Sequence, residues 1–334
     1  VPVATPQVSL AASTADARSG ASLPSQPTYR AWWAELAGSA SGGGLSASPV
    51  AAIESDVATD GATRYVAWAD ARNGSYEIYV ARFAGDAWSQ LGGSAQGGGI
   101  VPGAGEARDP SITVDGGGVP IVAWTEIVNG QSNIRVARWD AGSGAWIAFG
   151  GSLLPGGISA TGTARDAQVL ATASGPVVVW RDGGAGTQIY GKRWNGAAWV
   201  DVGAASASGG GISQWGSSVT DLAAATDGTR VAIAYVADGN VRVQQFDAGV
   251  WTAIGNPAWA TPQPAALPAI AYHQGSLFVA WQESTPEREQ IYAVRYSGGA
   301  WTEAGPGAAS GGGVSGVLGR AVAPQLASAG GQLW

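Results

Sequence analysis

The 334-residue sequence contains no cysteine and no methionine and is poor in charge: 12% of its residues are charged, and the formal net charge is −7. The absence of cysteine excludes disulfides, a thiol nucleophile and cysteine-ligated metal. Lys192 is the only lysine among 17 basic residues, and there is no basic cluster, so we expect no nucleic-acid partner. No apolar run reaches about 18 residues, so we expect no transmembrane segment.

Glycine and tryptophan, by contrast, are abundant, with 53 and 16 residues, and both recur along the chain. Glycine clusters read SGGGLS at 41–46, QGGGIV at 96–101, PGGIS at 155–159, SGGGIS at 208–213 and SGGGVS at 310–315. None contains the Lys-Ser/Thr pair of a nucleotide-binding loop, and each precedes a strand-like run rather than a helix. The clusters therefore mark a repeat and do not indicate a phosphate site.

Each repeat contains four short apolar runs separated by Gly, Asp or Asn turns. The second run ends in an aromatic residue, and the fourth begins with a tryptophan. Second-run aromatics are Trp68, Trp124, Trp180, Tyr235 and Trp281; fourth-run tryptophans are Trp33, Trp88, Trp146, Trp199, Trp251 and Trp301. Four antiparallel strands recurring every 50–60 residues or so are typical of a β-propeller blade. We predict an all-β propeller with six blades, or seven if a further blade is missing.

The two ends of the sequence predict how the ring closes. Residues 324–334, PQLASAGGQLW, match PAIAYHQGSLF at 268–278, and residues 29–44 match only the end of a repeat. We therefore expect the last blade to combine strands from both termini, which removes open sheet edges. The predicted organisation is an N-terminal extension or partial strand at 1–27 and one propeller domain at 28–334.

The motif VAW-x-D, followed by IYV-x-R-W and W-x-x-LGG, resembles repeats of bacterial secreted β-propeller proteins. NGSYEIYVARF at 73–83 is similar to TolB-type blades, and W-x-x-LGG is similar to the outer strand of some propeller lectins. The resemblance extends from about residue 28 to 334 and implies architecture and a secreted, bacterial origin rather than an activity. The sialidase Asp-box does not fit, because Asp60 precedes Trp68 by eight residues rather than about five.

Arginine recurs at one place in the third run, as Arg82, Arg138, Arg193 and Arg295. Sialidases hold a substrate carboxylate with three arginines around the propeller axis. A residue repeated in every blade more often serves the blade, so we expect these arginines to pair with turn residues Asp60, Asp115 and Asp227. The repeated tryptophans are likewise predicted to fill the core between blades.

Binding residues are expected where one blade departs from the others. Trp32, Trp215 and Trp259 lie outside the repeat positions, and the last two lie in connectors on either side of the fourth repeat. Exposed aromatic rings in loops stack on sugars or on apolar partner groups. We predict ligand binding at these three residues, with Asp238 as a polar neighbour; the alternative is that each ring folds back onto its own blade.

An acidic residue follows each second-run aromatic, and repetition would place the set in a ring on one face. Its members besides Asp238 are Asp70, Glu126, Asp182 and Glu283. Such oxygens could attract Ca²⁺ or a polyhydroxylated ligand, but turn residues that satisfy backbone amides have the same pattern. We therefore predict neither a resident metal nor another cofactor, with Ca²⁺ as the alternative.

The single histidine, His273, makes a Ser-His-Asp triad or a histidine metal site improbable, and no pair of carboxylates stands out from the repeat. The sequence therefore favours a non-catalytic, secreted or cell-surface propeller that recognises a carbohydrate or a partner protein. The alternatives are a structural subunit of a surface layer, filament or larger assembly, and a carbohydrate-active, glycosidase-like enzyme.

Overall fold

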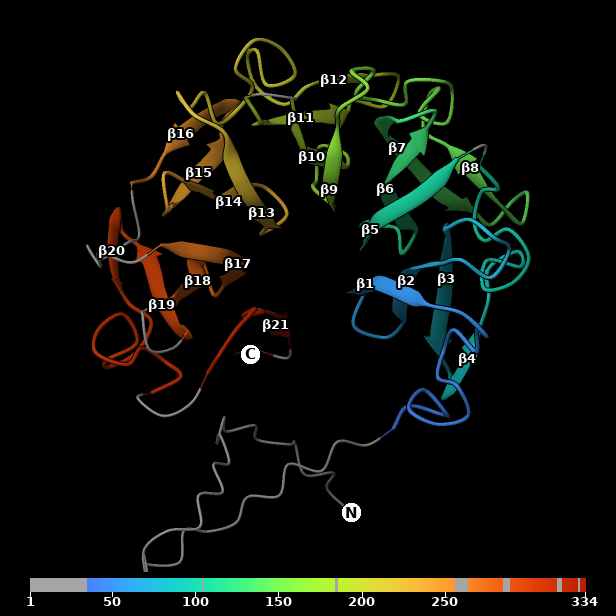
Figure 1. The fold of residues 1–334 in the computed structure, drawn as a ribbon, viewed down its shortest axis with the longest axis horizontal. Helices are drawn as coiled ribbons and strands as arrows, with labels where there is room; N and C mark the ends of the chain where they lie inside the picture. Colours follow the sequence, from blue (N-terminus) through green and yellow to red (C-terminus); the bar gives the residue numbers. More distant parts are fainter. Residues whose placement is uncertain are drawn as a thin grey trace, which may run out of the picture.

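A computed structural model describes residues 35–103, 105–183, 186–255, 264–284, 289–316, 320–329 and 331–334. These residues form five four-stranded antiparallel sheets and one two-stranded sheet, arranged around a common axis (Figure 1). The first strand of each sheet lies innermost and the fourth lies at the rim. This arrangement confirms the predicted all-β propeller, and no helix among the described residues could cross a membrane.

The five complete sheets are named blades 1 to 5 in chain order. Blade 1 contains β1 (Ala52–Thr59), β2 (Arg64–Asp70), β3 (Glu77–Ala84) and β4 (Ala87–Ser89). Blade 2 contains β5 (Glu106–Val114), β6 (Pro120–Val128), β7 (Gln131–Asp140) and β8 (Ala145–Ala148). Blade 3 contains β9 (Arg165–Leu170), β10 (Val177–Asp182), β11 (Gln188–Trp194) and β12 (Trp199–Asp201). Blade 4 contains β13 (Val219–Thr226), β14 (Val231–Ala237), β15 (Asn240–Asp247) and β16 (Val250–Ala253). Blade 5 contains β17 (Ala265–His273), β18 (Ser276–Ser284), β19 (Glu289–Ser297) and β20 (Ala300–Glu303), and β21 (Ser328–Ala329) and β22 (Gln332–Leu333) follow.

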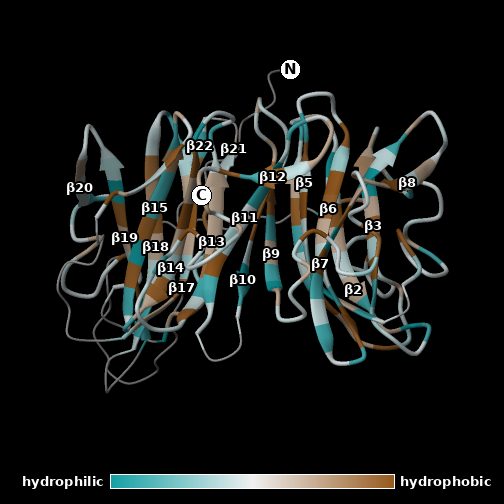
Figure 2. Cartoon of the chain, turned by 90° about the horizontal axis from the view of Figure 1, so that it is seen from above, coloured by the Kyte–Doolittle hydropathy of each residue, from teal (hydrophilic) through white to brown (hydrophobic). Residues whose placement is uncertain are grey.

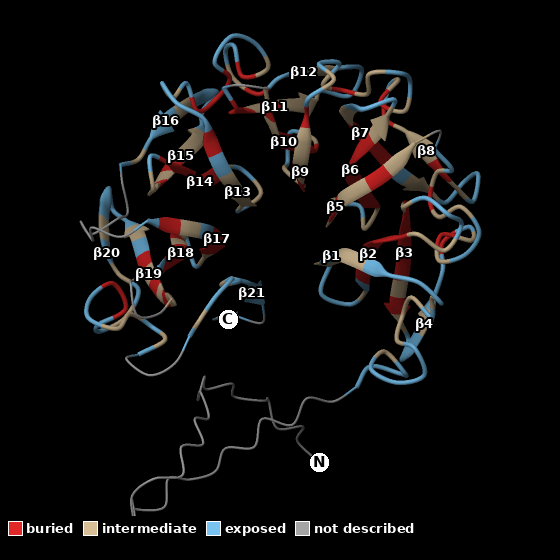
Figure 3. Ribbon diagram, viewed as in Figure 1, coloured by how far each residue is buried: buried red, intermediate tan, exposed pale blue. Residues whose placement is uncertain are grey.

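The hydrophobic core lies between neighbouring blades rather than at the axis. Apolar residues are concentrated on the strands (Figure 2), and buried residues are most frequent on the second and third strands (Figure 3). Trp124 of blade 2 packs in one cluster with Tyr65 and Val80 of blade 1, and Trp180 of blade 3 packs with Ile121 of blade 2. The predicted core role of the second-strand aromatics is confirmed.

The fourth-strand tryptophans join each blade to the one before it through a hydrogen bond that the sequence does not reveal. The indole N–H of Trp146 donates to the carbonyl of Leu91, and that of Trp301 donates to Ile254. In blade 1, Trp88 donates to the carbonyl of Leu36 at 2.6 Å. Leu36 therefore occupies the place of the outer end of a preceding blade, as predicted for the segment 29–44, of which residues 29–34 lie outside the described part.

The C-terminal segment continues the ring after blade 5. His273 Nδ1 lies 2.9 Å from Ser328 Oγ, and the backbone N–H of Ala323 donates to the side chain of Gln282. β21 and β22 pair with each other as an inner hairpin, as predicted from the match to 268–278. Residues 35–51 form turns and no strand, so the pairing of the two termini in one blade stays a prediction.

The predicted pairing of third-strand arginines with turn aspartates is wrong. Asp60 accepts the backbone N–H groups of Ala62 and Thr63 in its own turn, and Asp115 does the same for Gly117 and Val119. Asp227 forms an ion pair with its turn neighbour Arg230. The Arg138 guanidinium instead lies 4.8 Å from the Phe149 ring centroid, and Arg82 donates to Ser89. Turn aspartates reach nearby amides at less entropic cost than a long side chain on another strand.

Candidate functional site

The innermost strand of each of the five blades has a β-bulge or irregularity at the same place. The ladder between the first and second strands shifts register between Ile53 and Asp56 in blade 1, and at matching positions in blades 2 to 5. One residue in each bulge has left-handed backbone geometry. These residues are Glu54 (φ 54°), Asp109 (49°), Asp166 (54°), Asp221 (47°) and Leu267 (49°), with Ala323 (51°) at the matching place before β21. Positive φ is uncommon for residues other than glycine, and Asp tolerates it better than most.

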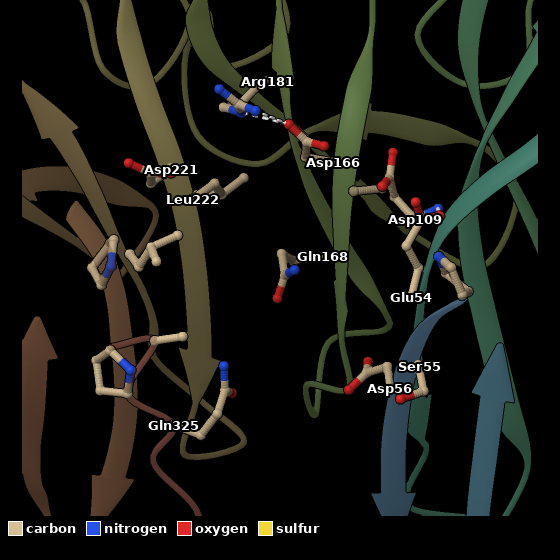
Figure 4. Close-up of a pocket in the computed structure, with 16 residues that line it drawn as sticks. Glu54, Ser55, Asp56, Asp109, Asp166, Gln168, Arg181, Asp221, Leu222 and Gln325 are labelled. Carbon is tan, nitrogen blue, oxygen red and sulfur yellow. Dashed lines mark hydrogen bonds and ion pairs between the residues drawn. The ribbon is translucent and has the colours of Figure 1, made fainter. Parts of the chain in front are cut away.

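The five bulges and the matching residue Ala323 surround one pocket, which we call the axial pocket, with a volume of about 460 Å³ (Figure 4). All six of these residues line it, together with Ser55, Asp56, Pro110, Ala167, Gln168, Arg181, Leu222, Pro268, Pro324 and Gln325. The lining is rich in carboxylate and amide groups and contains no aromatic side chain. The polar groups come from blades 1 to 4 and the C-terminal segment, whereas blade 5 contributes Leu267 and Pro268.

Two of the bulge carboxylates are neutralised by arginine. Arg108 Nη2 donates to Glu54 Oε1 at 2.8 Å, and Arg108 Nε donates to Oε2 at 3.1 Å. Burial raises the pKa of Glu54, but the hydrogen bonds from Arg108 and from the backbone N–H of Asp109 outweigh it and hold the pKa below its usual range. Arg181 Nε donates to Asp166 Oδ2 at 2.6 Å. Both guanidinium groups are therefore already engaged within the protein.

The other carboxyl groups lack a basic partner of this kind. Burial, followed by the negative charges of Asp166 and Glu54, raises the pKa of Asp109 to about 6. Burial also raises the pKa of Asp56, although the backbone N–H of Ile112 donates to it at 2.8 Å. Asp221 is half-buried and accepts a hydrogen bond from the hydroxyl of Thr220. The axial pocket thus offers both ionised and protonatable carboxyl groups near neutral pH.

The predicted acidic residues lie elsewhere and are committed to their blades. Asp70, Glu126, Asp182 and Glu283 are all at most 8% exposed. They lie beside the glycine-rich connectors, as predicted: Ser48 donates to Asp70, and Thr161 donates to Asp182. Their burial leaves no open ring of carboxylates at these positions. In the described ranges, no three His, Asp or Glu side chains are grouped so that they could hold a metal ion.

The structure brings together two of the residues predicted to bind ligand. Trp215 is half-buried, and its indole Nε1 donates to Asp238 Oδ2 at 2.8 Å. Ser217 donates to the other oxygen of Asp238, and the Arg242 guanidinium lies 4.5 Å from the Trp215 ring centroid. Trp32 and Trp259, also predicted to bind ligand, lie outside the described residues. Ligand binding at these two residues therefore stays a prediction.

The bulge residues of the axial pocket were missed by the sequence analysis, although the sequence contains a signal for them. Glu54, Asp109, Asp221 and Ala323 each follow the last glycine of a glycine cluster by ten residues, and Asp166 follows by nine. The spacing becomes meaningful once each connector is known to lead directly to an innermost strand. Proline after three of the six positions, at Pro110, Pro268 and Pro324, marks the same irregularity.

No protein-family model matches the chain, and neither does any curated protein. Several solved structures are similar. A Hadza microbial sialidase, Hz136, is 13% identical with a TM-score of 0.48 over 75% of this chain and 57% of the sialidase. Trypanosoma rangeli sialidase in complex with the inhibitor DANA is 13% identical, with a TM-score of 0.47 over 74% of this chain and 45% of the sialidase. An ulvan lyase of polysaccharide lyase family PL25 is 12% identical, with a TM-score of 0.47 over 74% and 69%. The chain spans about half the length of the two sialidases, and at these identities the likeness concerns the fold alone.

Proposed function

We propose that this protein is a non-catalytic binding propeller that holds a neutral carbohydrate in its axial pocket, outside the cell or at its surface. The observation that carries the proposal is that carboxyl groups from bulges at one repeated position meet amide and guanidinium groups in a single hollow. Sugar hydroxyls both donate and accept hydrogen bonds, so a lining with both kinds of partner suits them. A volume of about 460 Å³ is in the usual range for ligand pockets.

The charge of the axial pocket favours a neutral ligand over an anionic one. Its one arginine, Arg181, is engaged by Asp166, and Arg108 is engaged by Glu54. An anionic sugar would meet Asp109 and Asp221 with no free guanidinium to offset the repulsion. The third-strand arginines, which would be needed for a sialidase-like clamp, do not line the axial pocket.

The test compares two variants at the same kind of bulge. Asp221→Gly removes a carboxylate at a left-handed position where glycine is unstrained, and Leu267→Gly makes the same backbone change without removing a polar group. Binding is measured by isothermal titration with neutral gluco-, manno-, galacto- and N-acetylglucosamine oligosaccharides, and with sialylated ones. We expect a neutral oligosaccharide to bind, Asp221→Gly to weaken it about tenfold and Leu267→Gly to leave it nearly unchanged.

Absence of binding by every oligosaccharide, or equal losses in both variants, would contradict the proposed site. Preference for sialylated ligands would contradict the neutral class. Binding of a partner protein that is insensitive to Asp221→Gly would support the other sequence-based hypothesis, recognition of a protein. Ordered self-association without any ligand would support the structural subunit.

One observation favours a second candidate function, a carbohydrate-active enzyme. Asp109, with a pKa of about 6, and Asp166, paired with Arg181, line the same pocket. Glycosidic bond cleavage uses two carboxyl groups, one of which donates a proton, and a raised pKa favours Asp109 for that role. Incubation of labelled oligosaccharides with wild type and Asp109→Asn separates the two functions. A lyase or hydrolase would release products only with the wild type, whereas a binding protein would release none with either.

A further inference from the structure

One connector position makes the same kind of hydrogen bond in three blades. Counting from the conserved Ile or Leu after the glycines, Ser48, Thr161 and Trp215 are equivalent residues. Each is preceded by a residue with positive φ: Ala47 (43°), Ala160 (56°) and Gln214 (44°). The local backbone is therefore the same in the three connectors, and only the side chain changes.

The side chain at this position donates a hydrogen bond to the acidic residue at the end of the second strand or directly after it. Ser48 Oγ donates to Asp70 at 2.8 Å, and Thr161 Oγ1 donates to Asp182 at 2.7 Å. In blade 4, Trp215 Nε1 donates to Asp238 at 2.8 Å. A side-chain donor thus occupies this place in three blades, and a hydroxyl is enough in two of them.

The indole ring of Trp215 is therefore larger than the hydrogen bond to Asp238 requires. Arg242 lies against the ring, but an arginine at this position does not need an aromatic neighbour, as blade 2 shows. There the equivalent arginine, Arg135, pairs with Glu126, and the equivalent connector residue is Gly103. A large aromatic side chain at a position that elsewhere holds Ser, Thr or Gly needs another reason.

A hollow of about 470 Å³ lies beside this ring. Its lining combines Trp215 with Gln188, Gln214, Ser217 and backbone of Gly210 and Gly216. Gln188 is 7% exposed and is fixed by the connector: its Oε1 accepts the Trp215 backbone N–H at 2.8 Å, and its Nε2 donates to the Ser217 carbonyl at 2.8 Å. The buried Gln188 amide therefore fixes the backbone of the connector residues that line the hollow.

We infer that this Trp215 hollow is a second carbohydrate subsite, separate from the axial pocket. A flat aromatic ring beside amide, hydroxyl and backbone groups suits a neutral sugar ring, which presents C–H groups on its face and hydroxyls at its edge. The inference rests on the proposed function in one respect, namely that the ligand is a glycan. The connector links the two sites: Trp215 lies six residues before Asp221, a distance of at most about 20 Å along an extended chain.

The test uses protein labelled with 5-fluorotryptophan and the substitution Trp215→Thr. Threonine restores the residue of blade 3, which keeps a donor for Asp238 and removes the ring. The ¹⁹F resonance that disappears in this variant belongs to Trp215. We expect titration with the neutral oligosaccharides named above to shift that resonance, and Trp215→Thr to weaken binding about tenfold at an unchanged melting temperature.

A second variant, Gln214→Ala, keeps Trp215 and copies blades 1 and 3, which have alanine at this position; we expect it to weaken binding about threefold. If an oligosaccharide binds and Asp221→Gly weakens it, but the Trp215 resonance does not move, the second subsite is overturned and the axial site stands. If the resonance moves while Asp221→Gly has no effect, the axial site fails and the Trp215 hollow stands. If no oligosaccharide binds, both fail.

Discussion

Trp281 donates its indole N–H to Glu283, two residues later on the same strand, over 2.7 Å. The same bond joins Trp68 to Asp70 and Trp180 to Asp182. A carboxylate that is nearly fully buried needs such donors, because burial without them is costly. The repeated aromatic and the repeated acid therefore work together. The tryptophan fills the space between blades and donates a hydrogen bond to the acid, which in blades 1 and 3 also accepts one from the connector that precedes the blade.

Trp124→Ala should be strongly destabilising. Trp124 is 3% exposed and packs between blades 1 and 2, so truncation removes its burial and leaves a cavity. We expect a loss of about 3–5 kcal/mol in the free energy of unfolding, measured by urea denaturation. Trp334→Ala, at a position that is 37% exposed, serves as the control and should cost less than about 1 kcal/mol. Similar losses in the two variants would contradict the assignment of Trp124 to the core.

Trp215→Ala and Trp215→Thr should differ in stability, although both remove the same ring. Alanine removes the indole hydrogen bond to Asp238, keeps the one from Ser217 and uncovers Arg242, whereas threonine supplies a hydroxyl in place of the indole N–H. We expect a loss of about 1–2 kcal/mol for alanine and less than about 1 kcal/mol for threonine in urea denaturation. Equal losses would show that the bond to Asp238 contributes nothing.

The sequence predicted the blade, its strands and its aromatic core because each repeats a pattern that strand periodicity and turn residues specify locally. It predicted less about Trp215. Its position in a connector predicted an exposed ring, whereas the ring is half-buried and hydrogen-bonded. That bond joins residues 23 positions apart, and no local pattern specifies it. The axial pocket was missed for the same reason, since the five bulges meet only after the blades have assembled around the axis.

Glu77 should make stability depend on pH. It is 7% exposed, and burial, with a smaller contribution from the negative charge of Glu126, raises its pKa to about 7. The folded state therefore retains a proton that the unfolded state releases between about pH 4.5 and 7, so stability falls as pH rises through that window. Glu77→Gln should remove this dependence and be more stable than the wild type by about 2 kcal/mol at pH 8, with little difference at pH 4.5.

The reciprocal substitution is a matched control. Gln290 occupies the equivalent position in blade 5, is 4% exposed, and donates to the carbonyl of Gly316. Gln290→Glu should show the same decrease in the free energy of unfolding between pH 4.5 and pH 8, measured by urea denaturation at both values. A pH-independent Gln290→Glu variant, together with an unchanged profile for Glu77→Gln, would contradict the role of burial at this position.

Closure of the ring by the two termini can be tested by cross-linking, which is simplified by the absence of native cysteine. Gln332 lies on β22, which pairs with β21 on one side in the described part of the chain. If residues 29–33 continue this sheet, Gln332→Cys combined with a cysteine at one of these five positions should form a disulfide under mild oxidation. Deletion of residues 324–334 should also lower the melting temperature in a single cooperative transition, because it exposes edges on both neighbouring parts of the ring. No disulfide at any of the five positions, together with an unchanged melting temperature after the deletion, would show that the two ends do not share a blade.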